Sequence, residues 1–410
     1  FNVGRVLPGD FSTTATRGAL GAGDLLLAQG GRDRINLTYM PTFVWRHDGL
    51  VWKAEAGVGH SRGSNKVRDI DKGFFNNTQV RRSNVTVSFQ DIFYLRPGRI
   101  SVTDSAGAPV DPFNLNSYAL ASSNSIQNDS ADLKRSAYAN LRRDFYGRVP
   151  FTLKGGIDVR ESMRDVRGGT RLFSFVGADG RASTNPTAGD DQAAPFLDPS
   201  FSQRELPFGH GRAQWTSNEK LWGLYQTQPN YYTIDPNAAY RSAVGLSKRA
   251  AEVISSAYVR GDLQLMERRL KLTGGLRAEQ TNIEAEGPLT DPTRNFQRDA
   301  SGRIMLGANG RPLNILPTAN ALGVSQLTYI DRGLHAEKEY FRLFPSLNAS
   351  FNLRENLIAR AAYYQSVGAP NFNQYAGGIT LPDTESPPAT NNRITVSNVG
   401  IKAWDARTVK

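Results

Sequence analysis

The residues best suited to contact a ligand are aromatic, and they gather in one polar segment of the chain. They are Trp215, Trp222, Tyr225, Tyr231, Tyr232 and Tyr240. Flat rings with a polar edge can stack on sugars or grip other small ligands. The alternative is that these rings pack the segment against itself or its neighbours. We predict ligand contact here because binding residues concentrate on loops held by a rigid frame.

Residue types that perform catalysis or hold metals form no comparable pattern. The four histidines are scattered along the chain, at His47, His60, His210 and His335. Without a pair at metal-ligand spacing, they argue against a histidine metal site. The absence of cysteine excludes a disulfide, a thiolate ligand and a cysteine nucleophile. Asp190 and Asp191 lie in a loop rich in glycine and proline, where we expect both to be solvated. We predict no enzyme activity, no cofactor and no metal.

The chain is basic, with 49 Lys and Arg against 38 Asp and Glu and a net charge of +11. A basic chain can bind nucleic acid or an anionic surface. Here the basic residues are spread along the whole sequence and no block of them occurs, so we predict no nucleic-acid partner.

The elements expected to position these residues are β-strands. From Leu50 to Val58, apolar or small residues alternate with polar residues or glycine. A period of two gives a strand one apolar and one polar face. The segment 35–45 alternates in the same way, although Pro41 interrupts its ladder. The Asp48-Gly49 pair between the two segments supplies the tight turn of a hairpin.

Four more hairpins follow the same pattern. They pair 85–93 with 100–102, 133–141 with 151–159, 251–262 with 270–278, and 341–351 with 357–364. A further strand begins at Arg407. Residues 1–32 are Gly-rich and unpatterned, and we expect them to be loop. The connections between hairpins are long and polar, at roughly 62–80, 105–130, 164–245, 285–335 and 368–395.

This alternation of short turns and long loops favours an antiparallel transmembrane β-barrel, an all-β fold with short periplasmic turns and long extracellular loops. No apolar run is long enough for a membrane helix. In a barrel the apolar faces meet lipid and the charged faces meet a wet lumen. The residues expected in the lumen are Lys154, Asp158, Lys271, Arg277, Glu279 and Arg342. Those expected against lipid are Leu153, Ile157, Leu272 and Leu347. Arg135 lies on the lipid side and is tolerable only near a rim.

Three parts of the second half carry a family resemblance. Residues 248–259 read KRAAEVISSAYV and 270–279 read LKLTGGLRAE. Residues 344–347 read FPSL, and 356–363 read NLIARAAY. Residues 397–402 read SNVGIK, where the family has two prolines. Together they resemble the barrel of the TonB-dependent receptors of Gram-negative outer membranes, whose complete barrels have 22 strands.

The resemblance implies that residues 1–410 are a partial barrel, truncated at both ends, with the plug domain and final strands outside the chain. It implies a receptor in the outer membrane of a Gram-negative bacterium that takes up a scarce ligand, such as siderophore-iron, cobalamin or an oligosaccharide. The implied partners are outer-membrane lipid, the ligand, and the TonB complex, through a plug and TonB box not present in this fragment. The alternatives are a passive porin or adhesin barrel and, less favoured, a soluble all-β carbohydrate-binding protein.

Overall fold

The structure is a computed structural model that describes residues 1–187, 189–368, 370–397 and 403–410. Most of these residues form antiparallel strands, which confirms the all-β prediction. The family-like residues 398–402 lie outside the described part. The chain divides into two compact units. Unit 1 comprises Phe1–Ile35, Val67–Gln127 and Gly169–Ser242, and unit 2 comprises Asn36–Lys66, Asn128–Gly168 and Ala243–Lys410.

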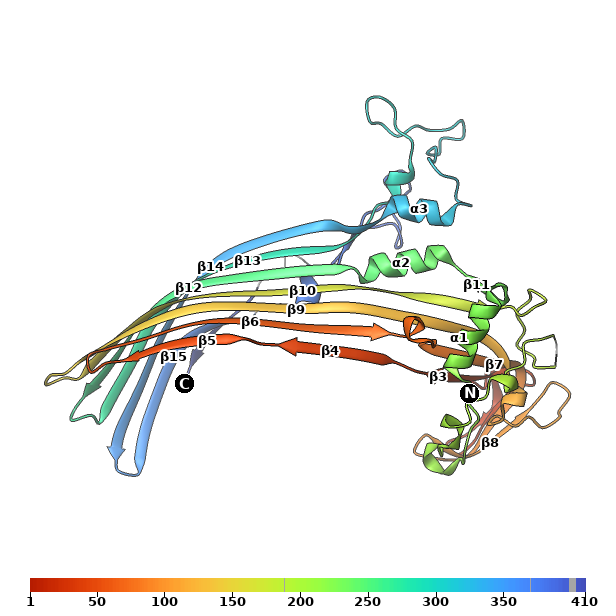
Figure 1. Cartoon of the computed structure of the whole chain (residues 1–410), viewed down its shortest axis with the longest axis horizontal. Helices are drawn as coiled ribbons and strands as arrows, with labels where there is room; N and C mark the ends of the chain where they lie inside the picture. Colours follow the sequence, from red (N-terminus) through yellow and green to blue (C-terminus); the bar gives the residue numbers. More distant parts are fainter. Residues whose placement is uncertain (188, 369, 398–402) are drawn as a thin grey trace. The chain divides into compact units, whose positions relative to one another are not determined.

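Long antiparallel strands form the sheet of unit 2, and their short turns gather at one end (Figure 1). In order of pairing they are β4 (Asp33–Tyr39) with β5 (Thr42–Asp48), β6 (Trp52–Arg68), β9 (Ala119–Phe145), β10 (Phe151–Phe175), β12 (Lys248–Leu265), β13 (Leu270–Thr290), β14 (Tyr329–Arg354), β15 (Leu357–Gly368) and β18 (Trp404–Val409). β18 pairs with β15, and β4 and β5 both pair with β6.

The predicted turns are confirmed. The chain reverses between β12 and β13 through Met266, Glu267 and Arg268, all with positive φ, in the segment where the sequence predicts the turn. The first predicted strand is broken as expected, because β4 ends at Tyr39 and β5 begins at Thr42, one residue to either side of the Met40-Pro41 pair.

Pro345 lies inside β14, where a residue without a backbone N–H would normally weaken a ladder. Its neighbour in β13 is Leu276, but the pairing of β14 with β15 begins only at Ser346. The proline therefore occupies the point where the ladder to β15 ends.

The strands extend further than the sequence predicts, and this corrects the predicted loops. Most of 62–80 belongs to β6 and β7 (Asn77–Phe93), and β9 begins inside the predicted loop 105–130. β10, β13 and β14 likewise run into the predicted loops 164–245 and 285–335. The reason is that the apolar residues stop while backbone pairing continues, as between Glu284 and Glu337. Periodicity of side chains reports burial or lipid contact, not the length of the ladder.

Two glycines on the polar face of this sheet are covered by tyrosine rings. A Cβ at Gly57 would lie 2.6 Å from Cε1 of Tyr138, and a Cβ at Gly156 would lie 2.8 Å from Cε1 of Tyr258. The Tyr138 hydroxyl donates to Glu55 at 2.9 Å, and the Tyr258 hydroxyl donates to Asn140 at 2.6 Å. The glycines thus make room for rings that hold neighbouring strands together.

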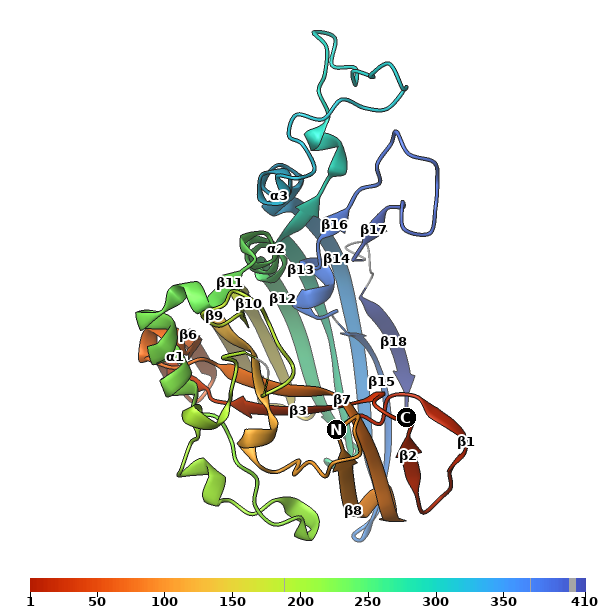
Figure 2. The same ribbon diagram turned by 90° about the vertical axis from the view of Figure 1, so that its right-hand side faces the viewer.

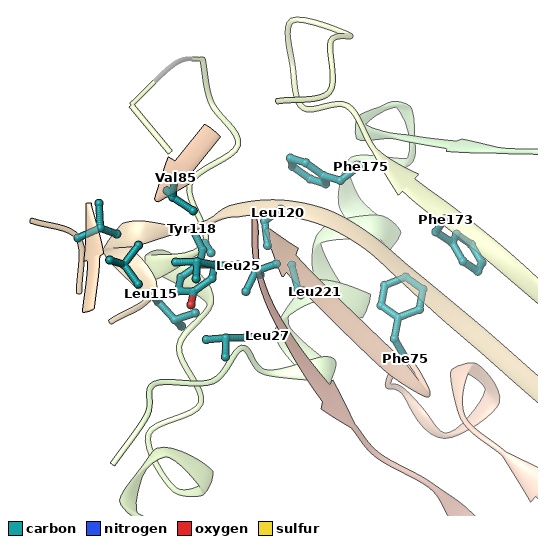
Figure 3. Close-up of a cluster of buried hydrophobic side chains, with 14 of the residues drawn as sticks. Leu25, Leu27, Phe75, Val85, Leu115, Tyr118, Leu120, Phe173, Phe175 and Leu221 are labelled. Atoms are coloured by element: carbon teal, nitrogen blue, oxygen red, sulfur yellow. The ribbon is translucent and has the colours of Figure 1, made fainter. Parts of the chain in front are cut away.

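Shorter elements enclose a hydrophobic core in unit 1. The strands are β1 (Val6–Phe11), β2 (Thr16–Gly18), β3 (Gly23–Gly30), β7, β8 (Arg96–Thr103) and β11 (Tyr232–Ile234), joined by the ends of β9 and β10. The helices are α1 (Asn218–Thr227) and most of α2 (Pro236–Leu246). The prediction of loop for residues 1–32 is therefore wrong, and the segment 164–245 contains helices as well as loop. Leu25, Phe75, Val85 and Leu115 are fully buried in the core (Figure 3).

The remaining elements follow β13 in unit 2. Helix α3 (Ala321–Thr328) leads directly into β14 and lies beyond the end of that strand (Figure 2). β16 (Ile379–Thr380) pairs in parallel with β13 and antiparallel with β17 (Thr395–Val396), and α4 (Phe372–Tyr375) precedes them. No helix within the described ranges is both long and apolar enough to cross a bilayer.

Candidate binding loops and conduit wall

Helix α1 carries two of the predicted ligand-contact residues. Its first turn is capped by Ser217, whose Oγ accepts a hydrogen bond from the Lys220 amide at 3.2 Å. This cap is what starts a helix inside a polar loop. Trp222 and Tyr225, three residues apart, lie on one face of α1 and stack at 5.3 Å between ring centroids. Trp222 packs edge-on against Phe75 at 5.3 Å.

Two more candidates join the same group of rings, Tyr231 at the end of η6 (Pro229–Tyr231) and Tyr232 at the start of β11. Tyr232 pairs with Phe175 at the end of β10, and its ring meets the Phe175 ring at 5.1 Å. Its hydroxyl donates to the Leu221 carbonyl at 3.4 Å. The Tyr232 side chain is buried, and burial raises the pKa of its hydroxyl. We call the group the aromatic cluster: Phe75, Phe173, Phe175, Trp222, Tyr225, Tyr231 and Tyr232.

The other two candidates lie outside the aromatic cluster. Trp215 is half-buried and packs edge-on against Phe201 at 5.9 Å. Tyr240 lies on α2 and is half-buried. The structure thus brings four of the six predicted residues together, as part of the packing of unit 1. Their contact with a ligand stays a prediction.

The expectation that Asp190 and Asp191 are solvated is wrong for Asp191. Asp191 is 1% exposed, and its Oδ2 accepts a hydrogen bond from the Ser183 amide at 2.6 Å. Its own carbonyl accepts from the Leu120 amide at 2.7 Å, which joins the loop to the start of β9. Burial raises the pKa of the Asp191 carboxyl, and the neighbouring Asp190 adds to that shift, although the Ser183 hydrogen bond opposes it.

Buried polar groups tie α1 and η1 (Ile70–Lys72) to the strands of unit 1. The Thr78 hydroxyl donates to Asn218 at 2.8 Å. Asp69 is fully buried and accepts hydrogen bonds from the Ser125 hydroxyl at 2.8 Å and the Ile126 amide at 2.6 Å. Satisfied groups of this kind fix one arrangement of the loops.

The charged residues of unit 2 share one face of the sheet, as predicted. Opposite residues of an antiparallel ladder point to the same side. Asp158 pairs with Ser256, Ser256 pairs with Glu279, and Glu279 pairs with Arg342. All four side chains therefore lie on the same face of the sheet. The same face carries Lys154, which is an even number of residues from Asp158. It also carries Lys271 and Arg277, which are an even number of residues from Glu279.

Four of these side chains form an ion-pair network. Arg160 donates to Asp158 at 2.8 Å, and Arg277 lies 3.1 Å from Glu279. A second contact of 3.5 Å joins Arg277 to Asp158, and one of 3.9 Å joins Arg160 to Glu279. Arg342 pairs with Asp405 of β18 and also donates to the Ala403 carbonyl. The network lines a polar face without leaving these charges unpaired.

The opposite face of the same sheet is apolar and uncovered. Ile157 is 60% exposed and Leu347 is 54% exposed, while Leu272 is half-buried. On β14 the outward residues are apolar from Phe351 to Phe341. That distance is about 34 Å along the strand. A tilt of about 45° reduces it to about 24 Å, close to the roughly 25 Å apolar band of outer-membrane barrels.

The upper limit of this band falls within one row on β10, β13 and β14, whereas β12 has Val253 and Ala251 beyond it. We call each set of paired outward residues on β10, β12, β13 and β14 a row. The last fully apolar row is Ile157, Ala257, Ala278 and Leu343. The second row beyond it consists of Glu161, Val253, Asn282 and Glu339. The third row consists of Met163, Ala251, Glu284 and Glu337. Arg135 pairs with Glu161 at 3.2 Å, which places it at this limit.

Comparison with known families decides the identity of this fold. A family model of the TonB-dependent receptor-like β-barrel matches residues 75–409. The chain belongs to the TonB-dependent receptors. The predicted family resemblance is confirmed, and the match reaches into the first half of the chain, where the sequence motifs did not.

Several solved receptors are similar at low identity. The ferric-catecholate import receptor Fiu of E. coli K12 matches in its closed form with 11% identity over 97% of this chain and 55% of its own, at a TM-score of 0.35. Its open form matches with 13% identity over 78% and 37%, at 0.29. A double mutant of the Serratia marcescens hemophore receptor HasR, in complex with its hemophore HasA and heme, matches with 9% identity over 95% and 51%, at 0.26. The chain therefore spans roughly a third to just over half of the length of these structures. No curated protein sequence matches the chain.

One motif of this receptor chain resembles a catalytic signature. Gly59-His60-Ser61-Arg62-Gly63 matches G-x-S-x-G. In hydrolases that motif forms a sharp turn between a strand and a helix. Here it lies inside β6, where Ser61 is one residue of a continuous strand. Among the described residues, no group of three or more His, Asp or Glu side chains could hold a metal ion.

Proposed function

We propose that this chain forms part of the wall and the external loops of an outer-membrane receptor in a Gram-negative bacterium. The observation that carries the proposal is the narrow zone, one row deep, in which the outward residues of β10, β13 and β14 change from apolar to polar. A hydrocarbon layer has such a boundary, whereas a protein partner would leave an irregular outline. Family membership supports the same location, because the long loops then lie outside the cell and the short turns face the periplasm.

In this proposal the charged face of unit 2 is the wall of the transport path. The network around Asp158 and Arg277 offers a wet surface along which a polar cargo can move without meeting hydrocarbon. The ligand is scarce and too large for porins, and its classes are siderophore-iron, cobalamin and oligosaccharide. An anionic iron chelate suits the net charge of +11 best, because a basic surface raises the local concentration of an anion. Energy would come from the TonB complex through a plug outside residues 1–410.

The loops of unit 1 would make the first contact with the ligand. Trp215, Trp222, Tyr225, Tyr231, Tyr232 and Tyr240 remain the candidates. Trp222, Tyr225 and Tyr231 are half-buried, so part of each ring is accessible while the rest packs in the aromatic cluster. Tyr232 is buried and would act by holding Trp222 and Tyr225 in place.

Uptake by whole cells that express the complete receptor tests this proposal. A radiolabelled ferric chelate should accumulate in a saturable way, and an uncoupler of the proton gradient should abolish accumulation. Cobalamin and a maltodextrin serve as the other two ligand arms. Uptake that is unsaturable and insensitive to the uncoupler would favour a passive porin instead.

The loop candidates need a separate measurement. Trp222→Phe keeps most of the packing against Phe75 but changes the stacking surface, so ligand affinity should fall while the unfolding midpoint changes little. Ligand affinity unchanged in Trp222→Phe, Tyr225→Phe and Tyr231→Phe would leave these rings a purely structural role. A chain that stays soluble without detergent would contradict the membrane location and favour the soluble carbohydrate-binding alternative.

A further inference from the structure

Two adjacent arginines near the end of β9 have opposite environments. Arg142 points to the charged face and donates to Asp144 at 2.8 Å. Arg143 points to the apolar face, where its guanidinium carbon lies 5.0 Å from the Trp52 ring centroid and 4.7 Å from that of Phe145. Within the described part of the chain, no carboxylate lies at ion-pair distance from Arg143, which is exposed. Two aromatic rings contact this cation, and no carboxylate of the described residues neutralises it.

A hollow of about 560 Å³ opens beside Arg143 on the same apolar face. Trp52, Leu141, Leu153 and Ile157 are among the side chains that line it, and Ala139 and Gly155 contribute no bulk to it. A second hollow of about 330 Å³ continues from it, since both include Ala139 and Ile157 in their lining. We call the first one the Arg143 hollow.

The backbone does not require glycine at position 155. A Cβ added there would meet only the Tyr258 carbonyl oxygen, at 3.4 Å, which is close to an ordinary contact. At Gly156, by contrast, a Cβ would lie 2.4 Å from Asn140 and 2.7 Å from the Ala139 carbonyl oxygen. Gly156 is therefore needed for packing on the charged face. The consequence of Gly155 is empty space on the apolar face.

We propose that the Arg143 hollow binds one phospholipid, with its phosphate on the Arg143 guanidinium and an acyl chain along the apolar lining. The guanidinium has its donors in a planar fork that matches two phosphate oxygens. The rings of Trp52 and Phe145 pre-orient that fork, which lowers the loss of side-chain freedom on binding. Most of the lining is apolar and suits a methylene chain, which fills the space left by Ala139 and Gly155.

The position of Arg143 fits the headgroup level of a bilayer. The residue is three positions before the predicted turn at Tyr146-Gly147, and Trp45 and Trp52 are exposed on the neighbouring strands. Tryptophan and tyrosine rings mark membrane interfaces. The inference therefore rests on the proposed outer-membrane location, and the lipid would belong to the periplasmic leaflet.

Arg269 provides a matched control within the same sheet. It also lies next to a short turn, and its guanidinium carbon is 5.5 Å from the Phe351 ring centroid. However, Arg269 donates to the carbonyls of Asn352 at 3.1 Å and Leu353 at 2.9 Å. These bonds occupy the Nε–Nη2 edge of its guanidinium, so that edge is not available to two phosphate oxygens.

Native mass spectrometry of the complete receptor tests the proposal. The receptor is delipidated in a mild detergent and titrated with dioleoyl-phosphatidylglycerol. The wild type should retain one molecule that Arg143→Gln binds about tenfold more weakly, as expected for loss of a charged hydrogen-bonding partner. Gly155→Leu should show a similar loss because its side chain fills the hollow, whereas Arg269→Gln should bind like the wild type. Dioleoylglycerol, which has the chains but no phosphate, should not be retained.

Three results would overturn the inference. They are equal retention by the wild type and Arg143→Gln, equal loss in Arg143→Gln and Arg269→Gln, and retention of dioleoylglycerol at the level of phosphatidylglycerol. Heat-modifiable migration in detergent gels establishes that each variant is a folded barrel. A wild-type receptor that enters neither detergent micelles nor vesicles would instead contradict the proposed function, which separates the two failures.

Discussion

Strands of both units alternate apolar and polar residues, but the apolar face is buried in unit 1 and exposed in unit 2. In β7 of unit 1, Val85 and Val87 are fully buried, because α1 and the loops before it supply a second layer. In β10 of unit 2, Leu153 and Ile157 also share one face of their strand and are 42% and 60% exposed. A period of two states only that the faces of a strand differ. What covers the apolar face is decided by other segments of the chain, or by lipid.

The polar faces of the two units differ as well. Unit 1 ties its loops together with single buried groups such as Asp69, each satisfied by short hydrogen bonds. Unit 2 spreads its charges over an open network centred on Arg277 and Glu279. The first arrangement fixes one conformation, whereas the second leaves a hydrated surface.

The largest expected effect is the loss of a ring from the aromatic cluster. Phe75→Ala should destabilise unit 1 by about 3–5 kcal/mol, because a fully buried ring leaves a cavity. Hydrogen exchange of β7 and α1 in the complete receptor measures this. Ile157→Ala is the control in unit 2 and should change exchange far less, because lipid can fill the vacated space. Similar losses in both variants would mean that Ile157 is packed against protein.

A charge on the apolar face should have the next largest effect. Leu347→Lys should cost about 2–4 kcal/mol in a bilayer, because Leu347 lies midway between Phe351 and Phe341 in the apolar band. Asn282→Lys lies four rows beyond, among polar outward residues, and should be nearly neutral. Urea unfolding in phospholipid vesicles compares the two variants. Equal costs would show that the boundary of the band is misplaced.

Glycine substitutions separate the two faces of the sheet. Gly57→Ala should cost about 1–3 kcal/mol, because its Cβ would overlap the Tyr138 ring. Gly155→Ala should be close to neutral, since only the Tyr258 carbonyl oxygen lies nearby. Thermal unfolding of both variants in detergent gives the comparison. A Gly155→Ala variant as unstable as Gly57→Ala would show that the apolar face is more tightly packed than the contacts indicate.

The smallest effect concerns pH and applies to unit 1. Burial raises the pKa of Asp191 above its value in the unfolded chain, so the folded state takes up the proton at a higher pH. Stability from this group should therefore increase as pH falls through the raised pKa towards about 4, and be lost as pH rises. Urea unfolding followed by the fluorescence of Trp215 and Trp222 should show this in the wild type.

Asp191→Asn is the control for that titration, because it retains an acceptor for the Ser183 amide but cannot ionise. The difference in stability between wild type and variant should change with pH in the stated direction. A constant difference across the range would mean that the Asp191 carboxyl keeps its ordinary pKa.

The hairpins of unit 2 could be predicted because two signals agree there. Alternation identifies the strands, and residues such as Asp48-Gly49 and Tyr146-Gly147 mark the turns between them. The face on which a side chain lies can also be predicted, because successive residues of a strand point to opposite sides. Lys154 and Ile157, an odd number of residues apart, lie on opposite faces of the sheet. The family motifs at 270–279 and 344–347 gave the correct family.

Unit 1 was less predictable for physical reasons. Strands β1 to β3 are short and interrupted by glycine, so no alternation builds up within residues 1–32. The role of Val85 and Val87 as core residues depends on contacts with segments more than 20 residues away, including Leu115. One sequence pattern indicates helix α1: the N-cap residue Ser217 is followed by Leu221, Trp222 and Tyr225 at helical spacing. The burial of Asp191 has no local signal, because its hydrogen bonds depend on where β9 begins.

The ordered sheet continues well past the apolar band. On β13 the strand runs from Ala278 to Thr290, about 40 Å at the usual rise per residue. In the proposed orientation, the part of this wall that antibodies or phage meet outside the cell is regular strand with outward acidic residues such as Glu284 and Glu337. Such a surface has a fixed shape, so it presents conformational epitopes that a peptide taken from a mobile loop could not reproduce.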